Sequence, residues 1–253
     1  MHLIYIKEFL IFVCSKRNFL VMDKKIIYTS GEYLENNPSW HVEDSPWKAG
    51  QILELIRRNN LKPRSICEVG CGAGEILRQL QQQLPKVTFS GYEISPQAYK
   101  LCQQRKNSGI RFYLKNLLED GRAFFDVVLA IDVIEHVDDY LGFLRALRGK
   151  GKYKIFHIPL DLSVQTVWRE KPISKLRRTV GHLHYFTKET ALAALSDNGY
   201  KIVDYFYTSA AVDLPARSFI SWLGKLPRKI MFKLNPDLTA RLLGRYSLMV
   251  LTK

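Results

Sequence analysis

Three glycines occupy alternate positions in residues 65–75, the stretch Ser-Ile-Cys-Glu-Val-Gly-Cys-Gly-Ala-Gly-Glu. A β-favouring start runs into Gly70, Gly72 and Gly74, and the apolar residues that follow have helical spacing, which predicts a strand, a tight turn and a helix. Glycines let the turn backbone approach a ligand closely, and the first turn of the helix presents unpaired N–H groups there. The stretch is therefore suited to a cofactor that carries a nucleoside.

Two carboxylates accompany this loop. Glu68 lies two positions before the first glycine, and Glu93 ends a second predicted strand, 23 residues after Gly70. An acid at the end of the second strand can accept hydrogen bonds from both ribose hydroxyls. The dinucleotide fingerprint would need a glycine where the chain has Glu75, and the Walker phosphate-binding pattern is absent.

Four histidines could accept a proton from a reacting group. His136 follows a predicted strand at 125–130, which places it at the carboxyl edge of a parallel sheet, where ligands bind. The segments of His157, His182 and His184 approach the same edge. We predict His136 and His184 as catalytic residues, with His157 and His182 as further candidates; the alternative for His136 is that it orients the start of the next helix.

The glycine loop, the strand that ends in Glu93, and the segment Asp132-Val-Ile-Glu-His-Val that follows the 125–130 strand occur in one order. Together they resemble the class I S-adenosylmethionine-dependent methyltransferases, in particular the small-molecule type of ubiquinone biosynthesis. Residues 181–187 resemble the segment before the late helix of the same proteins. The resemblance implies a Rossmann-like α/β fold: a seven-stranded sheet, mostly parallel with an antiparallel last strand, and helices on both faces.

The resemblance also implies S-adenosylmethionine as the cofactor and a set of residues around it. The expected cofactor-binding residues are Glu68, Gly70, Gly72, Gly74, Glu93, Asn116, Ile131 and Trp47. Asn116 stands where the family usually has an aspartate that contacts the adenine amino group, and its side-chain carbonyl can accept the same hydrogen bond. No metal site is expected.

The helix predicted from Pro46 to about Arg58 precedes the first strand, and in the resembling family such a helix covers the cofactor. Its aromatic and basic neighbours are therefore candidates for a lid: Trp40, His41, Trp47 and Lys48. The alternative is that the aromatic residues only pack the helix.

The 253 residues carry a formal net charge of +14, which favours an anionic partner or surface. The four cysteines include no Cys-x-x-Cys pair, as expected of reduced thiols in a cytoplasmic protein. The longest uncharged run near the N-terminus, Phe9–Ser15, is too short for a membrane span. We interpret residues 1–22 as an extension, 23–62 as a lid segment with its helix, and 63–253 as the cofactor-binding domain.

Two insertions interrupt that domain, a long irregular segment at 160–186 and a second one at 211–245. The second interleaves large apolar residues, among them Phe219, Trp222 and Ile230, with basic ones. Such a segment predicts a cap over the acceptor pocket or peripheral contact with an anionic membrane. The alternative is a helical cap with a solvated basic face.

The expected acceptor is a small-molecule, lipid-linked or saccharide-type compound. A nucleic-acid methyltransferase and a non-catalytic scaffold are the alternatives. Nucleic acid is disfavoured because amino-methyltransferases of DNA and RNA carry an [DN]-P-P-[YFW] motif where this chain has residues 131–134, Ile-Asp-Val-Ile, and because no Pro-Cys dipeptide is present. The sequence carries no signal for the acceptor atom or for the oligomeric state.

Overall fold

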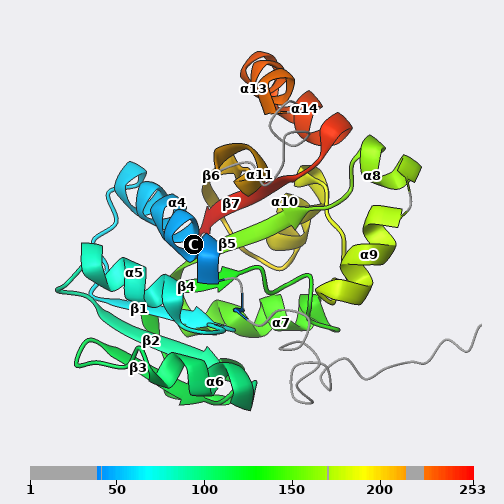
Figure 1. Ribbon diagram of the computed structural model, residues 1–253. Helices are drawn as coiled ribbons and strands as arrows, with labels where there is room; N and C mark the ends of the chain where they lie inside the picture. Colours follow the sequence, from blue (N-terminus) through cyan, green and yellow to red (C-terminus); the bar gives the residue numbers. More distant parts are fainter. Residues whose placement is uncertain (1–38, 41, 170, 215–224) are drawn as a thin grey trace, which may run out of the picture.

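The computed structural model of the chain describes residues 39, 40, 42–169, 171–214 and 225–253 (Figure 1). The predicted extension at 1–22, His41, and the apolar residues Phe219, Ile220, Trp222 and Leu223 of the second insertion lie outside the described residues.

A seven-stranded sheet forms the centre of the molecule, with the strand order β3-β2-β1-β4-β5-β7-β6. Its strands are β1 (Ser65–Val69), β2 (Thr88–Glu93), β3 (Ile110–Leu114), β4 (Phe125–Ile131), β5 (Gly151–Leu160), β6 (Ile202–Thr208) and β7 (Tyr246–Thr252). The five neighbouring strands β3, β2, β1, β4 and β5 pair in parallel. β7 runs antiparallel to both β5 and β6. The predicted sheet, mostly parallel with an antiparallel last strand, is confirmed.

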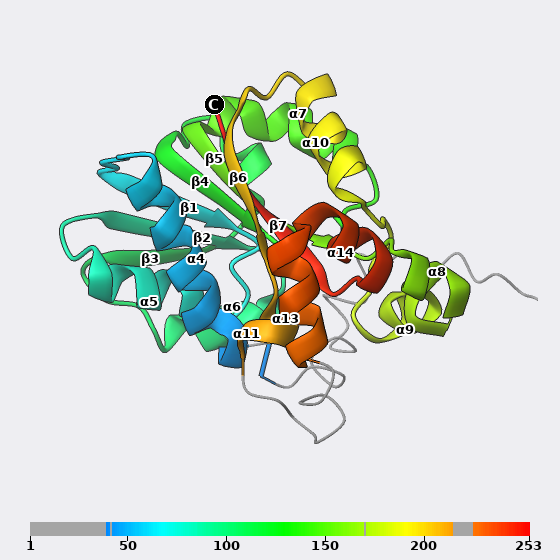
Figure 2. The same ribbon diagram turned by 90° about the horizontal axis from the view of Figure 1, so that it is seen from above.

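Helices cover both faces of the sheet (Figures 1 and 2). One apolar layer joins the sheet to α4 (Ser45–Arg58), α5 (Glu75–Gln83) and α6 (Pro96–Gln103). The other layer joins it to α7 (Tyr140–Leu147) and α10 (Lys188–Asp197). Because both faces of the central strands are covered, β4 buries every side chain from Val127 to Ile131 and reads as a continuous apolar run.

The insertions build a peripheral group of helices. These are α8 (Val164–Arg169), α9 (Lys171–Thr179), α11 (Ala210–Asp213), α13 (Lys225–Leu234) and α14 (Pro236–Leu243). The expectation of an irregular segment at 160–186 is wrong, because α8 and α9 fold there, and the hydroxyl of Ser163 accepts a hydrogen bond from the N–H of Thr166 in the first turn of α8. Among the described helices, none combines the length and the apolar character that crossing a bilayer requires.

Short 3₁₀ helices occur at η1 (Val42–Asp44), η2 (Leu117–Glu119) and η3 (Arg148–Lys150). The helix that follows β4 begins only at Tyr140, because Asp139 is its N-cap and accepts a hydrogen bond from Gly142 N–H over 2.7 Å. Residues 132–139 therefore form a loop at the carboxyl end of β4, and this loop brings Asp132, Glu135 and His136 to the functional edge of the sheet.

Candidate functional site

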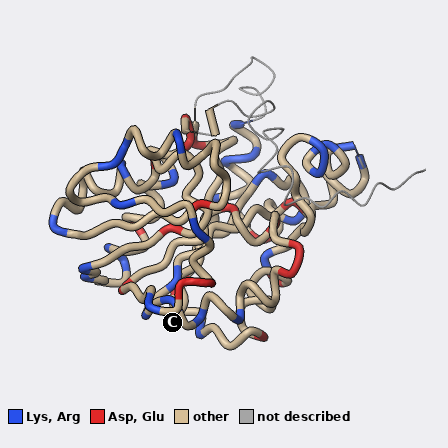
Figure 3. Tube along the Cα trace, turned by 90° about the horizontal axis from the view of Figure 1, so that it is seen from below, with Lys and Arg blue, Asp and Glu red and all other residues tan. Residues whose placement is uncertain are grey.

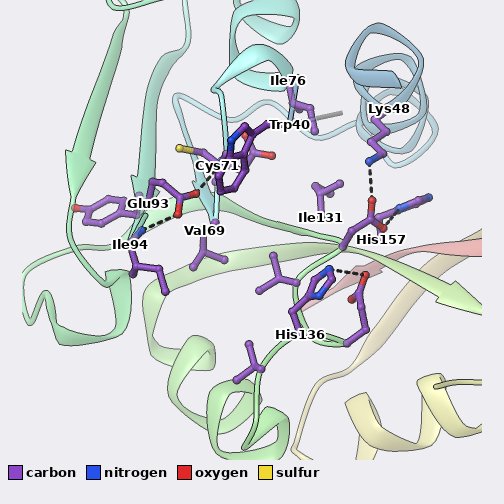
Figure 4. Close-up of a pocket in the computed structure, with 18 of the residues that line it drawn as sticks. Trp40, Lys48, Val69, Cys71, Ile76, Glu93, Ile94, Ile131, His136 and His157 are labelled. Carbon is purple, nitrogen blue, oxygen red and sulfur yellow. Dashed lines mark hydrogen bonds and ion pairs between the residues drawn. The ribbon is translucent and has the colours of Figure 1, made fainter. Parts of the chain in front are cut away.

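A pocket of about 760 Å³ opens at the carboxyl edge of the parallel strands (Figure 4). The ends of β1, β2, β4 and β5 form its floor, and residues of η1 and α4 line one side. Leu176 and Val180, from α9 and the segment after it, line another side. The chain continues from β1 to β2 on one side and from β4 to β5 on the other, so the strand order reverses between β1 and β4. The pocket lies at this reversal, which is where open α/β sheets bind ligands.

The glycine loop follows β1 and forms one wall of the pocket. Gly70 has φ +66° and Gly72 has φ +54°, conformations that L side chains rarely adopt. The N–H groups of Gly70 and Cys71 both donate to the carbonyl oxygen of Tyr92, over 2.8 and 3.1 Å, so the loop folds back onto the end of β2. A ligand can therefore approach the loop backbone without meeting a Cβ atom.

Gly74 differs from the other two glycines. It does not line the pocket, its φ is +76°, and a Cβ atom there would lie 2.6 Å from the ring of Phe112. This glycine is required by the start of α5 and by packing against β3. The structure therefore gives Gly74 a structural role, and its contact with the cofactor stays a prediction.

Glu93 at the end of β2 is buried and ties three backbone amides together. Its Oε2 accepts from Gly72 N–H over 2.8 Å, and its Oε1 accepts from the N–H groups of Ile94 and Ser95, each over 2.8 Å. Burial raises the pKa of this carboxyl, and these three donors counteract that shift in part. The acid predicted to hold the ribose therefore also fixes the loop beside it.

Glu68 lies below the glycine loop and is fully enclosed. Burial raises its pKa well above the usual value, with Lys48 counteracting and Glu93 reinforcing the shift. Its Oε2 has no hydrogen-bond partner in the described part of the chain. This oxygen can therefore accept a hydrogen bond when the carboxyl is ionised, or donate one when it is protonated. Lys48 reaches this part of the pocket from α4.

Asp132, Lys48 and His157 form a polar centre that the sequence analysis did not identify as a unit. Asp132 Oδ2 lies 2.7 Å from Lys48 Nζ, and its Oδ1 lies 2.6 Å from Nδ1 of His157. The other ring nitrogen of His157 contacts the hydroxyl of Thr208 on β6 over 2.9 Å. One network therefore links α4, β4, β5 and β6.

The charges in this centre stabilise one another. Burial opposes ionisation of Asp132, but His157 and Lys48 outweigh burial and hold the pKa of the carboxyl well below its usual range. Burial lowers the pKa of Lys48, and Asp132 more than offsets this, so the pKa lies above the usual value. Asp132 adopts φ +53°, which aspartate tolerates better than branched residues do.

Glu135, His136 and His182 form a second cluster in the same pocket. Figure 4 marks the contact of His136 Nε2 with the carboxylate of Glu135, at 3.9 Å. The rings of His136 and His182 pack edge to face with centroids 4.9 Å apart, and His182 Nδ1 lies 2.6 Å from Asp161. Two histidines and a buried carboxylate therefore meet at the loop after β4.

The two predicted catalytic histidines occupy different places. His136 lines the pocket, whereas His184 does not. The Nε2 of His184 lies 2.9 and 3.2 Å from the carbonyl oxygens of Val137 and Asp138, a geometry that requires the nitrogen to donate. This nitrogen therefore holds the loop after β4, and the catalytic role of His184 stays a prediction. His157 and His182, by contrast, line the pocket.

The remaining predicted cofactor residues Glu68, Gly70, Gly72, Glu93, Asn116, Ile131 and Trp47 all line the pocket. The side-chain oxygen Oδ1 of Asn116 caps η2 and accepts a hydrogen bond from Leu118 N–H over 3.0 Å. One lone pair of this oxygen is left for a ligand. Trp47 donates its indole N–H to Asp213 over 3.1 Å and lies edge-on to His157. The ring of Trp40, a lid candidate, lies 3.7 Å from the position that a Cβ atom would take at Gly72.

Comparisons with known proteins concern the family and the fold. The model of a family described as a methyltransferase domain matches residues 43–205. The chain is 29% identical over 124 residues to the tRNA U34 carboxymethyltransferase of Sulfurimonas denitrificans, covering 47% of this chain and 41% of that protein. It is 31% identical over 114 residues to the ubiquinone biosynthesis O-methyltransferase of Rickettsia bellii, covering 44% of this chain and 48% of that protein.

The matches therefore span less than half the length of these two relatives. Among solved structures, the magnesium protoporphyrin IX methyltransferase of Synechocystis superposes with a TM-score of 0.57 at 15% identity, covering 90% of this chain and 96% of that one. This likeness concerns the fold. Because the family model matches more than half of the chain, the chain belongs to the methyltransferase domain family, of the class I type whose cofactor is S-adenosylmethionine.

Proposed function

We propose that the protein transfers the methyl group of S-adenosylmethionine to a small-molecule, lipid-linked or saccharide-type acceptor. One observation carries this proposal: a single pocket joins the glycine loop and Glu93 on one side to a group of titratable side chains on the other. Such a pocket is large enough to hold a nucleoside and a second reactant together, which is what methyl transfer by displacement requires.

The cofactor half contains the elements for a nucleoside. The loop at Gly70 and Gly72 offers close backbone approach. Glu93 lines the pocket, and its three backbone donors leave one carboxylate lone pair for a ribose hydroxyl. Asn116 and Leu117 at the end of β3 line the side where the adenine ring is expected. Bound S-adenosylmethionine supplies an activated methyl group, and the residues of the chain align it with the acceptor.

The acceptor half lies toward Lys48, Asp132 and His136. Displacement at the methyl carbon needs a nucleophile in line with the sulfur, and removal of a proton when that nucleophile is a hydroxyl. We propose that His136 accepts this proton, because its ring lines the pocket and rests on His182 and Glu135. The centre at Asp132 holds Lys48 in a fixed position beside the same space.

The outer surface supports an amphiphilic acceptor. Helix α13 exposes Leu226, Ile230 and Leu234 at helical spacing, by 67, 52 and 80%. Lys229 and Lys233 are also exposed on this helix, and Trp168 of α8 is 85% exposed. Figure 3 shows Lys and Arg residues distributed over the outer elements. These features favour peripheral contact with an anionic membrane, where a lipid-linked acceptor would be found.

A nucleic-acid acceptor is the second candidate. The net charge of +14 and the tRNA-modifying relative favour it. The ubiquinone relative and the exposed apolar residues of α13 favour the lipid-linked acceptor instead. A scaffold without catalysis is disfavoured because both halves of the pocket carry reactive groups.

The test has two steps. Calorimetry of the purified chain should show binding of S-adenosylmethionine and of its demethylated product, with Gly72→Val as the variant that blocks the loop. Methyl-labelled cofactor is then incubated with lipid, quinone, sugar and RNA extracts. Label in a lipid, quinone or sugar fraction is the expected result. Label in RNA alone would show that the acceptor is a nucleic acid instead. Absence of cofactor binding would overturn the proposed function.

A further inference from the structure

We infer that Glu135, His136 and His182 form a binding site for a divalent transition-metal ion in the acceptor half of the pocket. One ligand atom from each residue lies within 4.8 Å of the others, so small side-chain movements would bring all three to a common ion. Two imidazoles and one carboxylate are a ligand set typical of zinc, iron(II) and cobalt sites that retain open positions for a substrate.

The first supporting observation is the state of Glu135. Its side chain is 0% exposed, and neither carboxylate oxygen has a hydrogen-bond partner among the described residues. A buried polar group without a partner is costly to the folded state, and a buried charge is more costly still. A cation at this position would satisfy both oxygens.

The second supporting observation is the surroundings of His182. Its Nδ1 lies 2.6 Å from Asp161 Oδ2, and Asp161 follows the end of β5. A carboxylate that holds one ring nitrogen of a histidine leaves the other free to bind a metal, and it fixes the direction of the ring. His182 therefore already has the outer partner that metal-ligating histidines usually have.

The backbone explains why these residues meet although 46 positions separate His136 from His182. The carbonyl oxygen of Glu135 accepts from the N–H groups of Leu183 and His184, over 2.7 and 3.2 Å. These two bonds attach the segment before α10 to the loop after β4. The attachment positions His182 next to its two candidate co-ligands.

This site also deepens the proposed function, and that part of the inference rests on it. The three residues line the pocket shared with the cofactor loop, so an ion there would act as a Lewis acid toward an oxygen of the acceptor. With the ion bound, His136 is one of its ligands, the ion lowers the pKa of the acceptor hydroxyl, and the proton of that hydroxyl passes to solvent; with no ion bound, His136 accepts the proton itself. Acceptors with two neighbouring oxygens, which can chelate an ion, are then favoured.

The experiment titrates the untagged full-length chain with Co²⁺ and Zn²⁺, following visible cobalt absorption and calorimetric heat. One equivalent should bind. Glu135→Gln and His182→Asn should weaken binding by at least about tenfold, and Asp161→Asn by roughly 10- to 100-fold. Glu119→Gln, which changes an exposed residue at the rim of the same pocket, should bind like the wild type. Cobalt–thiolate absorption bands would instead indicate the cysteines.

Folding and function are checked separately. Zn²⁺ should raise the melting temperature of the wild type, which tests binding without any variant. Each variant is also titrated with S-adenosylmethionine, so a loss of metal binding with intact cofactor binding is distinguished from failure of the proposed function. Absence of metal binding by the wild type, or equal binding by wild type and a folded Glu135→Gln variant, would overturn the inference.

Discussion

The carboxylate of Glu93 accepts a hydrogen bond from the backbone N–H of Gly72 over 2.8 Å. The acid that ends β2 therefore holds the turn that follows β1, and a ligand at this place would meet a loop whose shape is already set. Preorganisation of this kind reduces the entropy lost on binding.

We expect Glu93→Gln to weaken the binding of S-adenosylmethionine at least about tenfold, because hydrogen bonds to a charged group contribute roughly 1.5–3 kcal/mol each. The amide also places an NH₂ group against backbone donors. Calorimetric titration with the demethylated product measures the change. The control Glu54→Gln removes the same charge from an exposed ion pair on α4 and should bind normally. Equal affinities of the two variants would contradict the role of Glu93.

Substitutions at Gly74 and at Gly72 should have different effects on stability and on cofactor binding. Gly74→Ala places a Cβ atom 2.6 Å from the ring of Phe112, at a φ of +76° in the left-handed region that favours glycine, so stability should fall by roughly 2–4 kcal/mol. Gly72→Ala is strained at its φ of +54° but places its Cβ atom 3.7 Å from the ring of Trp40, an ordinary contact, so it should cost less stability and should mainly weaken cofactor binding. Urea unfolding and calorimetry distinguish the two outcomes. A larger loss of stability in Gly72→Ala would refute the distinction.

Asp132→Asn should reduce the free energy of unfolding by about 3–5 kcal/mol, because it leaves Lys48 enclosed without its counter-charge. Asparagine tolerates the positive φ of this position, so the backbone is not the cause. Urea unfolding at neutral pH measures the loss. Asp204→Asn, which removes the partner of the more exposed Arg58, is the control and should cost about 1 kcal/mol or less. Similar losses in both variants would argue against the buried centre.

The fall in the free energy of unfolding at acid pH should depend on the ionisation of Glu75. Burial opposes its ionisation, but hydrogen bonds from Arg78 and Arg105 lower its pKa to about 2. A lowered folded-state pKa stabilises the fold above the unfolded value near 4.5, and this contribution is lost as the pH falls toward 2. Glu75→Gln should be less stable at neutral pH and should lose less between pH 4.5 and 2. Parallel profiles from chemical denaturation would disprove this assignment.

Helix α13 should bind anionic vesicles. Lys225 donates to backbone carbonyls of Val212 and Leu214, so Lys229 and Lys233 are the exposed cations to change. Lys229→Glu with Lys233→Glu should reduce co-sedimentation, at about 1 kcal/mol per removed charge, and high salt should do the same. The control pair Lys62→Glu and Lys86→Glu changes two exposed lysines that precede β1 and β2 in the sequence. Equal binding to anionic and neutral vesicles would contradict electrostatic attachment and would favour a role for α13 as a cap on the domain.

Residues close in sequence were predictable from the sequence, and long-range contacts were not. Gly70, Gly72 and Glu93 belong to local patterns, so their elements and their common edge followed from the alternation of strands and helices. The contact of Lys48 with Asp132 joins residues 84 positions apart and depends on how α4 lies on the sheet. The role of His184 depended on which carbonyl oxygens its ring would face.

The place of β7 has a consequence for synthesis on the ribosome. Among the described strands, β6 pairs only with β7, and β7 lies between β5 and β6 although it follows both of them in the sequence. While the polypeptide emerges, β1 to β5 can assemble in order, but β6 has no neighbour until residues 246–252 also leave the exit tunnel. The edge of β5 that later pairs with β7 therefore stays unpaired during this interval, and such an edge is open to pairing with other chains until β7 covers it.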